Sequence, residues 1–194
     1  MQRPYQQLQS QIQDQPERTL RMQAFVDLLW PALSPTSVSW LGFYLKDGEQ
    51  LVLGPRRDKP ACSPIGLHGA CGQSLLQKKT LIVRDVRELG RNYVACDPRE
   101  QSELVIPCLA DDGSCWGVFD LDSFDIGSFS QADADGLVML LENKDTTVAE
   151  LMKAIPGPDF PTGAFVLGRG GIKDAYTNGR GSILMQARWQ IEQV

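Results

Sequence analysis

Histidine is almost absent from this 194-residue sequence, which contains His68 and no other. Catalysis of the Ser-His-Asp kind is therefore disfavoured unless His68 is itself the base. The five cysteines form no CxxC pair, which argues against a thioredoxin-type motif and against paired zinc knuckles. A phosphate-binding loop is also missing, because GxxxxGK[ST] does not occur and Lys173 stands where GxGxxG needs its third glycine.

Long apolar runs and an excess of positive charge are missing as well. No window of about 18 apolar residues occurs, so we expect no membrane span. The N-terminal MQRPY lacks the apolar core of a secretory signal, so we expect a reducing cytoplasm in which the cysteines are thiols. A formal net charge of -5 disfavours general nucleic-acid binding. With 42% hydrophobic and 22% charged residues, the composition is that of a globular protein.

Apolar residues at helical spacing predict a helix over 17–30, which Pro31 is expected to end. A short helix is expected over 69–78, with Leu75 and Leu76 facing inward. Ser130 has the spacing of a helix N-cap, because Asp133 follows three residues later.

Strand patterns fall between these helices. Two of them flank an Asp-Gly turn and two flank a second turn, which predicts two β-hairpins. The expected strands are 37–45, 50–53, 80–83, 104–110 and 115–121. This order of elements favours an α+β domain, in which helices pack on an antiparallel sheet.

Three cysteines stand at the ends of apolar runs, in Lys59-Pro60-Ala61-Cys62, Gly69-Ala70-Cys71-Gly72 and Tyr93-Val94-Ala95-Cys96-Asp97. A thiol beside Gly, Pro or Asp can be reached by substrate and can move to meet a second thiol. Carboxylates follow at Glu103, Asp120 and Asp122. Separate thiols combined with acids suggest redox chemistry in which one cysteine attacks and another resolves.

Several longer phrases occur in a fixed order: Ser39–Leu45 (SWLGFYL), Leu51–Pro55 (LVLGP), the three cysteine phrases, Ser102-Glu103 and Gly117–Ser123 (GVFDLDS). Over about residues 17–135 they resemble the GAF-domain free methionine-(R)-sulfoxide reductases. The resemblance implies a GAF-like antiparallel sheet flanked by helices, with free methionine sulfoxide as substrate. It also implies thioredoxin as external reductant, no bound cofactor or metal, and pairing of two chains through helices.

The same resemblance implies roles for the thiols. Cys96 would be the nucleophile and would become a sulfenic acid, with which Cys62 would condense to a disulfide. Cys71 would be an auxiliary thiol in the relay. Which of Cys62 and Cys71 resolves first stays open.

Roles for the acids and aromatics follow in the same way. Clustered carboxyls raise one another's pKa, so Glu103 and Asp122 are the candidates to protonate the sulfoxide oxygen. Asp120 would pair with the ammonium of free methionine sulfoxide. Trp40 and Tyr44 would enclose its thioether-like chain.

The tail has a different character, being basic and rich in Gly and Pro. From about Gly136 it resembles an internal piece of the A subunit of type IIA topoisomerases (gyrase or topoisomerase IV), through TVAELM, PGPDFPTG and GIKDAY. The DNA-cleaving tyrosine of that family would lie upstream, where nothing here matches. We therefore expect a GAF-like domain over 1–142 and a topoisomerase-like fragment over 143–194 that is poorly ordered.

Two other classes of function stay open. A non-catalytic GAF sensor that binds a small ligand would keep working after Cys96→Ser. A topoisomerase-derived fragment that binds DNA or protein would show salt-sensitive DNA binding even without any thiol. A zinc site built from Cys62, His68 and Cys71 is not expected, because their spacing fits no common site.

The resemblances predict that the tail is dispensable for chemistry. A fragment of about fifty residues rarely supports its own core. A chain ending at Asn143 is therefore expected to keep reductase activity, and protease should cut the full chain rapidly between Asn143 and Gly181. Activity assays and limited proteolysis test this expectation. Loss of folding on truncation would show that the tail is an integral layer of the domain.

Overall fold

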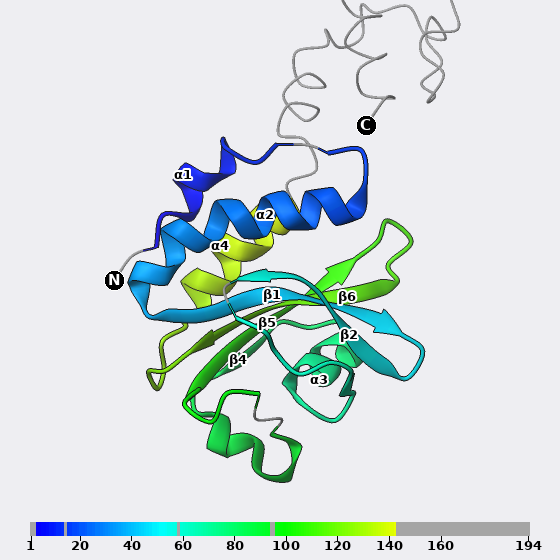
Figure 1. Cartoon of the computed structure of the whole chain (residues 1–194), viewed down its shortest axis with the longest axis vertical. Coiled ribbons are helices and arrows are strands. Elements are labelled where there is room, and N and C mark those ends of the chain that lie inside the picture. Colours follow the sequence, from blue (N-terminus) through cyan, green and yellow to red (C-terminus); the bar gives the residue numbers. More distant parts are fainter. Residues whose placement is uncertain (1–2, 14, 58, 94–95, 143–194) are drawn as a thin grey trace, which may run out of the picture. The chain divides into compact units, whose positions relative to one another are not determined.

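An antiparallel sheet with the order β3-β2-β1-β6-β5-β4 forms the centre of the structure (Figure 1). The structure is a computed structural model that describes residues 3–142, except 14, 58, 94 and 95. The strands are β1 (Val38–Asp47), β2 (Gln50–Arg57), β3 (Ile65–Gly66), β4 (Leu81–Val83), β5 (Ser102–Leu109) and β6 (Cys115–Ser123). The predicted α+β class and both predicted hairpins, β1–β2 and β5–β6, are confirmed.

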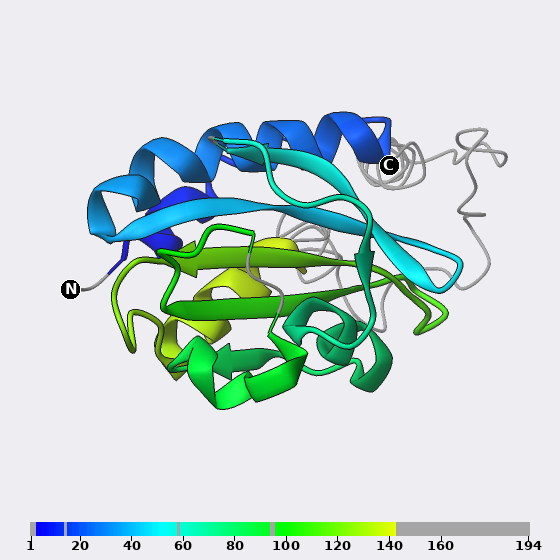
Figure 2. The ribbon, with the colours of Figure 1, turned by 60° about the horizontal axis from the view of Figure 1, so that its bottom comes forward.

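Helices cover both faces of the sheet, as Figures 1 and 2 show. One face carries α1 (Tyr5–Gln9), α2 (Arg18–Leu33) and α4 (Gln131–Leu141). The other face carries α3 (Ala70–Gln77) and the 3-10 segment η2 (Val86–Asn92). A short 3-10 turn, η1 (Ser34–Thr36), joins α2 to β1. None of the helices in the described part combines the length and apolar composition that a membrane span requires.

Each central strand presents its alternate residues to two separate apolar clusters. Toward α2 and α4, Phe25 packs against Phe119 with ring centroids 5.2 Å apart, and Phe43 lies 4.7 Å from Phe119. The main buried strand residues of this cluster are Val38, Leu41, Phe43, Leu104, Ile106, Phe119 and Leu121. The second cluster, beneath α3, contains Trp40, Tyr44, Leu51, Cys71, Leu75, Val105 and Val118 among others.

Two details of the helix prediction are wrong. α2 continues through Pro31 and ends at Leu33. Pro31 lies on the exposed side near the end of the helix, while Leu29 and Leu33 are fully buried, so burial of that last turn outweighs the missing N–H. On α3, Leu75 is buried but Leu76 is 62% exposed, because the helix packs on the sheet along one side.

The N-terminal segment, which the sequence pattern did not predict as helical, is held by a buried charge. Arg3 Nη1 lies 2.8 Å from Asp133 Oδ1, and Arg3 also donates to Thr36 and Ser128. The hydroxyl of Tyr5 donates to Asp133 at 3.0 Å. Asp133 also completes the predicted capping box with Ser130, so one carboxylate joins the start of α4 to the chain's beginning.

The proposed boundary at 142/143 and the poor order expected for 143–194 stay predictions, because 143–194 lies outside the described residues. For the described part, α4 is complete to Leu141 and buries Leu137 and Leu140 against the sheet.

Arg3→Met is expected to destabilise the fold by about 3 kcal/mol, because Asp133 would stay buried without its cation. Burial raises the pKa of Asp133, but hydrogen bonds from Arg3 and Ser130 outweigh that effect and leave the pKa lowered. A lowered folded pKa stabilises above the unfolded value of about 4, so the loss should shrink as pH falls below it. Urea denaturation at both pH values measures this.

Arg57→Met is the matched control for Arg3→Met. The Arg57–Asp27 pair is 41% and 44% exposed, so its loss should change the free energy of unfolding by less than about 1 kcal/mol. Equal effects of the two substitutions would contradict the role given to the buried pair.

Candidate active site

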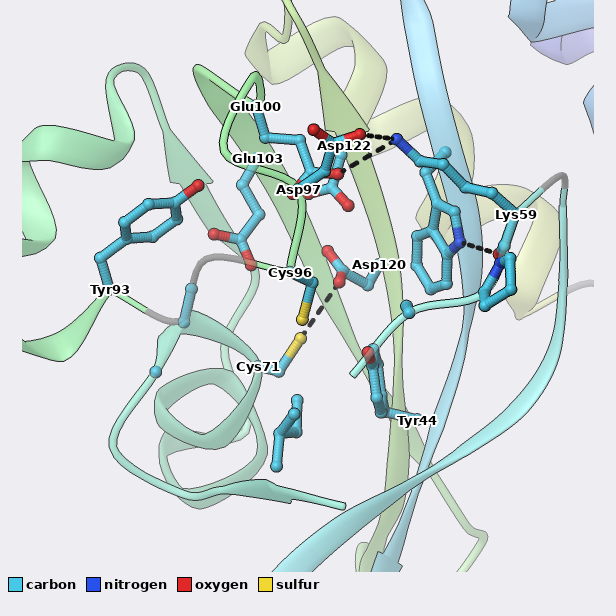
Figure 3. Close-up of a pocket in the computed structure, with 16 residues that line it drawn as sticks. Tyr44, Lys59, Cys71, Tyr93, Cys96, Asp97, Glu100, Glu103, Asp120 and Asp122 are labelled. Carbon is cyan, nitrogen blue, oxygen red and sulfur yellow. Dashed lines mark hydrogen bonds and ion pairs between the residues drawn. The ribbon is translucent and has the colours of Figure 1, made fainter. Parts of the chain in front are cut away.

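A small cavity of about 80 Å³ lies between the α3-covered face of the sheet, α3 itself and the loops that precede β3 and β5 (Figure 3). Its most distinctive property is charge, since five lining residues carry carboxyls and, among the described lining residues, only Lys59 carries an ammonium. The polar and sulfur-containing lining comprises Trp40, Tyr44, Lys59, Cys71, Tyr93, Cys96, Asp97, Glu100, Glu103, Asp120 and Asp122.

The register of the sheet brings three of these carboxyls together. Asp120 and Asp122 alternate along β6 and so face the same side, as the sequence predicted. Glu103 on β5 is the direct cross-strand partner of Asp122. On the other side of β6, Gly42 of β1 is the partner of Asp120. A Cβ at Gly42 would lie 2.6 Å from the Trp40 ring, so the glycine gives the indole room to lie across the strand.

Burial and mutual repulsion keep protons on these acids. Burial is the main cause that raises the pKa of Asp120 to about 7. Burial followed by the charge of Asp120 raises the pKa values of Glu103 and Asp122 well above their ordinary range. Carboxyls this close cannot all ionise, so the cavity holds carboxylic acids near neutral pH that can donate protons.

The Cys71 thiol lies at the first turn of α3 and donates to Asp120 Oδ2 at 3.3 Å. Cys71 is 4% exposed, and burial followed by the charge of Asp120 raises the pKa of its thiol well above the ordinary value. In Figure 3 the sulfurs of Cys71 and Cys96 both point into the cavity beside Asp120. All five cysteines of the chain are free thiols in this structure.

The aromatics of β1 fix the loop that carries Cys62. Trp40 Nε1 donates to the carbonyl of Lys59 at 3.0 Å, and the Tyr44 hydroxyl donates to the carbonyl of Cys62 at 2.9 Å. The Cys62 thiol thereby meets the Cys96 thiol, which also interacts with the Tyr44 hydroxyl. Burial, followed by Cys62, raises the pKa of Cys96 to about 12. Cys96 is therefore a neutral thiol before any substrate arrives.

An ion-pair cluster ties the Cys62 loop to the Cys96 loop. Lys59 pairs with Asp97, the residue after Cys96, and lies 3.7 Å from Glu100 Oε1. Asp97 also accepts from Arg99 at 2.7 Å, and hydrogen bonds from Arg99 and then Lys59 lower its pKa. The two cations share the ring of Phe124, at 4.8 Å for Lys59 and 4.5 Å for Arg99. This arrangement holds the two cysteine loops in register.

All the predicted site residues lie at or beside this cavity. Cys62 alone among them does not line it and stands behind Cys96 instead. The sequence reasoning missed four lining residues, Lys59, Tyr93, Asp97 and Glu100. Two of these, Asp97 and Tyr93, lie in the Cys96 phrase itself, so their position beside the thiol was a usable signal.

Comparison with known proteins identifies the relatives of this site. No protein-family model matches the chain. Free methionine-R-sulfoxide reductase of Escherichia coli is 35% identical over 127 residues, which cover 64% of this chain and 71% of that protein. The reductase of Saccharomyces cerevisiae is 36% identical over 119 residues, 58% of this chain and 66% of that one. This chain belongs to the free methionine-R-sulfoxide reductase family.

Solved structures agree with this assignment. The free methionine-R-sulfoxide reductase of Neisseria meningitidis in complex with its substrate is 33% identical, with a TM-score of 0.63 over 71% of this chain and 81% of that one. A GAF domain structure is 30% identical with a TM-score of 0.64. The predicted GAF-like fold of this reductase-family chain is therefore confirmed.

A second, separate match confirms the topoisomerase-like segment. The gyrase A protein of Halalkalibacterium halodurans, a DNA gyrase component, is 58% identical over 59 residues, which make up 30% of this chain. The matched piece spans 7% of that gyrase protein. The reductase-family chain thus carries a short piece of gyrase-like sequence besides its GAF domain.

Asp120→Asn is expected to stabilise the protein at alkaline pH. An acid whose folded pKa is raised holds a proton that the unfolded chain releases, so wild-type stability should fall as pH rises from about 4 to about 7. The amide has no such dependence, so the variant should gain roughly 1–3 kcal/mol over wild type near pH 8 and little near pH 4. Urea denaturation across this pH range measures the gain.

Asp135→Asn is the matched control, because Asp135 lies exposed on α4 with a hydrogen bond from Gln131. Its substitution should shift stability little at either pH. A gain for Asp120→Asn that is the same at both pH values would contradict the protonated state described for the cavity.

Proposed function

We propose that this chain reduces free methionine-(R)-sulfoxide to methionine in the carboxyl-lined cavity. The observation that carries the proposal is the meeting of three thiols with protonated buried acids in a member of this reductase family. The reductases of Neisseria meningitidis and Staphylococcus aureus have been solved as complexes with substrate, which supports a substrate-sized site in this fold. The remaining steps follow from the chemistry of the lining residues.

The first step joins a thiol to an acid. Cys96 attacks the sulfoxide sulfur while a carboxylic acid, Glu103 or Asp122, protonates the oxygen as the S–O bond breaks. Since the pKa of Cys96 is raised to about 12, its proton leaves during the attack rather than before it. The oxygen ends on Cys96 as a sulfenic acid. Methionine sulfoxide has then gained the two electrons that the thiol has lost.

The second step resolves the sulfenic acid. Cys62 stands against Cys96, so its thiol condenses with the sulfenic acid to form a disulfide and release water. This contact favours Cys62 as the first resolving thiol. Cys71, bonded to Asp120, would take the disulfide over in a later exchange. The dithiol of thioredoxin, in a reducing cytoplasm, would reduce the disulfide and restore the thiols.

Substrate recognition follows from the same charges. The ammonium of a free amino acid supplies the cation that the cavity lacks, and Asp120 is its proposed partner. Trp40 and Tyr44 form the wall against which the thioether-like chain would lie. Two chains paired through helices would leave this cavity intact, since it opens on the opposite side of the sheet from α1, α2 and α4.

Cys96→Ser is expected to abolish turnover, because a serine hydroxyl cannot accept the oxygen and return it. Cys62→Ser should still release about one equivalent of methionine per chain and then stall at the sulfenic acid. Single-turnover methionine release and trapping of the sulfenic acid by dimedone measure both outcomes. Cys115→Ala, on β6 outside the lining, serves as the active control. Normal turnover by Cys96→Ser would exclude Cys96 as the nucleophile.

Free methionine-(R)-sulfoxide should be consumed at least about 100-fold faster than the same residue inside a peptide. A peptide nitrogen carries no charge, so the proposed carboxylate partner would be left unpaired. NADPH consumption with thioredoxin and thioredoxin reductase measures the rates, with the (S) epimer as the stereochemical control. Comparable rates on free and peptide-bound substrate would overturn the proposed recognition.

A further inference from the structure

Three groups that can bind a metal meet on one side of the cavity. Cys71 from α3, Glu103 from β5 and Asp120 from β6 each place one ligand atom within 4.8 Å of the others. The Cys71 sulfur is already 3.3 Å from Asp120 Oδ2. Figure 3 shows all three side chains pointing toward a common point. The sequence predicted no metal site, and the reduction proposed above needs none.

A second observation at this point indicates a missing positive partner. Asp120 is 5% exposed, and its Oδ1 has no hydrogen-bond partner among the described residues, although Oδ2 accepts from Cys71. A buried carboxylate oxygen without a donor is unfavourable unless a proton or a cation occupies that side. Lys59 does not serve it, because its ammonium pairs with Asp97 and Glu100. The free oxygen lines the cavity, where an ion can reach it.

We propose that the reduced protein binds one Zn²⁺ ion through Cys71, Glu103 and Asp120. Zinc accepts a thiolate at about 2.3 Å and carboxylate oxygens at about 2.0–2.2 Å, so tetrahedral ligand atoms lie roughly 3.3–3.7 Å apart. The Cys71–Asp120 separation has this value already, and a small rotation of Glu103 brings in the third ligand. The fourth position faces the open cavity, as in sites with three protein ligands.

The ligand set selects for zinc over the abundant hard cations. Mg²⁺ and Ca²⁺ prefer oxygen ligands alone, whereas a thiolate favours zinc and similar softer ions. Binding transfers the thiol proton, and any proton held by the two carboxyls, to the solvent. The ion thereby neutralises a cluster that otherwise stays protonated or self-repulsive.

Such an ion would regulate the reaction. This consequence rests on the proposed function. Asp120 cannot serve the ion and the substrate ammonium together, and a metal-bound Cys71 cannot exchange disulfides. Zinc would therefore act as a reversible inhibitor that is competitive with substrate and that protects Cys71 from oxidation.

Co²⁺, a spectroscopic substitute for Zn²⁺, tests the site without substrate. The full chain, reduced and freed of reductant under nitrogen, should bind one equivalent and show near-ultraviolet thiolate-to-cobalt charge transfer that Zn²⁺ then displaces. Cys71→Ser should remove the band, and Asp120→Asn should weaken affinity by about tenfold or more. Cys108→Ala, which removes a buried thiol on β5 outside the cavity, should bind as wild type does.

The outcomes separate this proposal from the proposed reaction, because no step of the titration involves methionine sulfoxide. Circular dichroism of each variant establishes that it is folded, and Glu103→Gln provides a third ligand variant if Cys71→Ser is not. A charge-transfer band that survives in folded Cys71→Ser, or that disappears in Cys62→Ser, would place the metal at other thiols and overturn the assignment. Absence of any band or Zn²⁺ binding in the folded wild type would overturn it as well.

Discussion

A β-strand shows opposite faces at consecutive residues, and the molecule depends on how β6 uses this constraint. Phe119 and Leu121 face α2 and α4, where they complete the larger apolar cluster. Asp120 and Asp122 stand between and beyond them and must face the other way. Because the second face is also roofed, by α3 and the cysteine loops, those carboxyls are enclosed rather than hydrated. The core thus dictates where the acids lie, and the roof dictates their protonation.

Neutrality is the condition that makes such a cavity tolerable. Acids that keep their protons and thiols that keep theirs avoid the large cost of burying unpaired charge. A zwitterionic ligand changes this balance, since its ammonium stabilises one carboxylate and so releases a proton inside the cavity. In this view the proton that the sulfoxide oxygen needs becomes available only when the ligand is bound. The cation Lys59 stays outside the exchange because Asp97 and Glu100 hold it at the rim.

Periodicity was sufficient to predict the helices, the hairpins and the common face of Asp120 and Asp122, because each of these depends on local spacing. The resemblance directed attention to the thiols and acids that the fold then brings together. Contacts between distant segments could not be predicted this way. Arg3 meets Asp133 across 130 residues, and Lys59 meets Asp97 across 38, with no local pattern to indicate either partner. Pro31 misled the prediction because a proline's effect depends on which side of the helix is buried.

The last helix has a consequence for how such a chain can arise. The gyrase-like resemblance begins at about Gly136, inside α4, so Leu137 and Leu140 of the reductase-family core belong to sequence of another ancestry. The sheet asks of this stretch only helical spacing of two leucines and, at Gly136, no side chain, where a Cβ would lie 2.4 Å from the Tyr5 ring. Requirements so few are met by many unrelated segments. A recombination that falls inside a terminal amphipathic helix can therefore keep a domain folded while replacing everything that follows it.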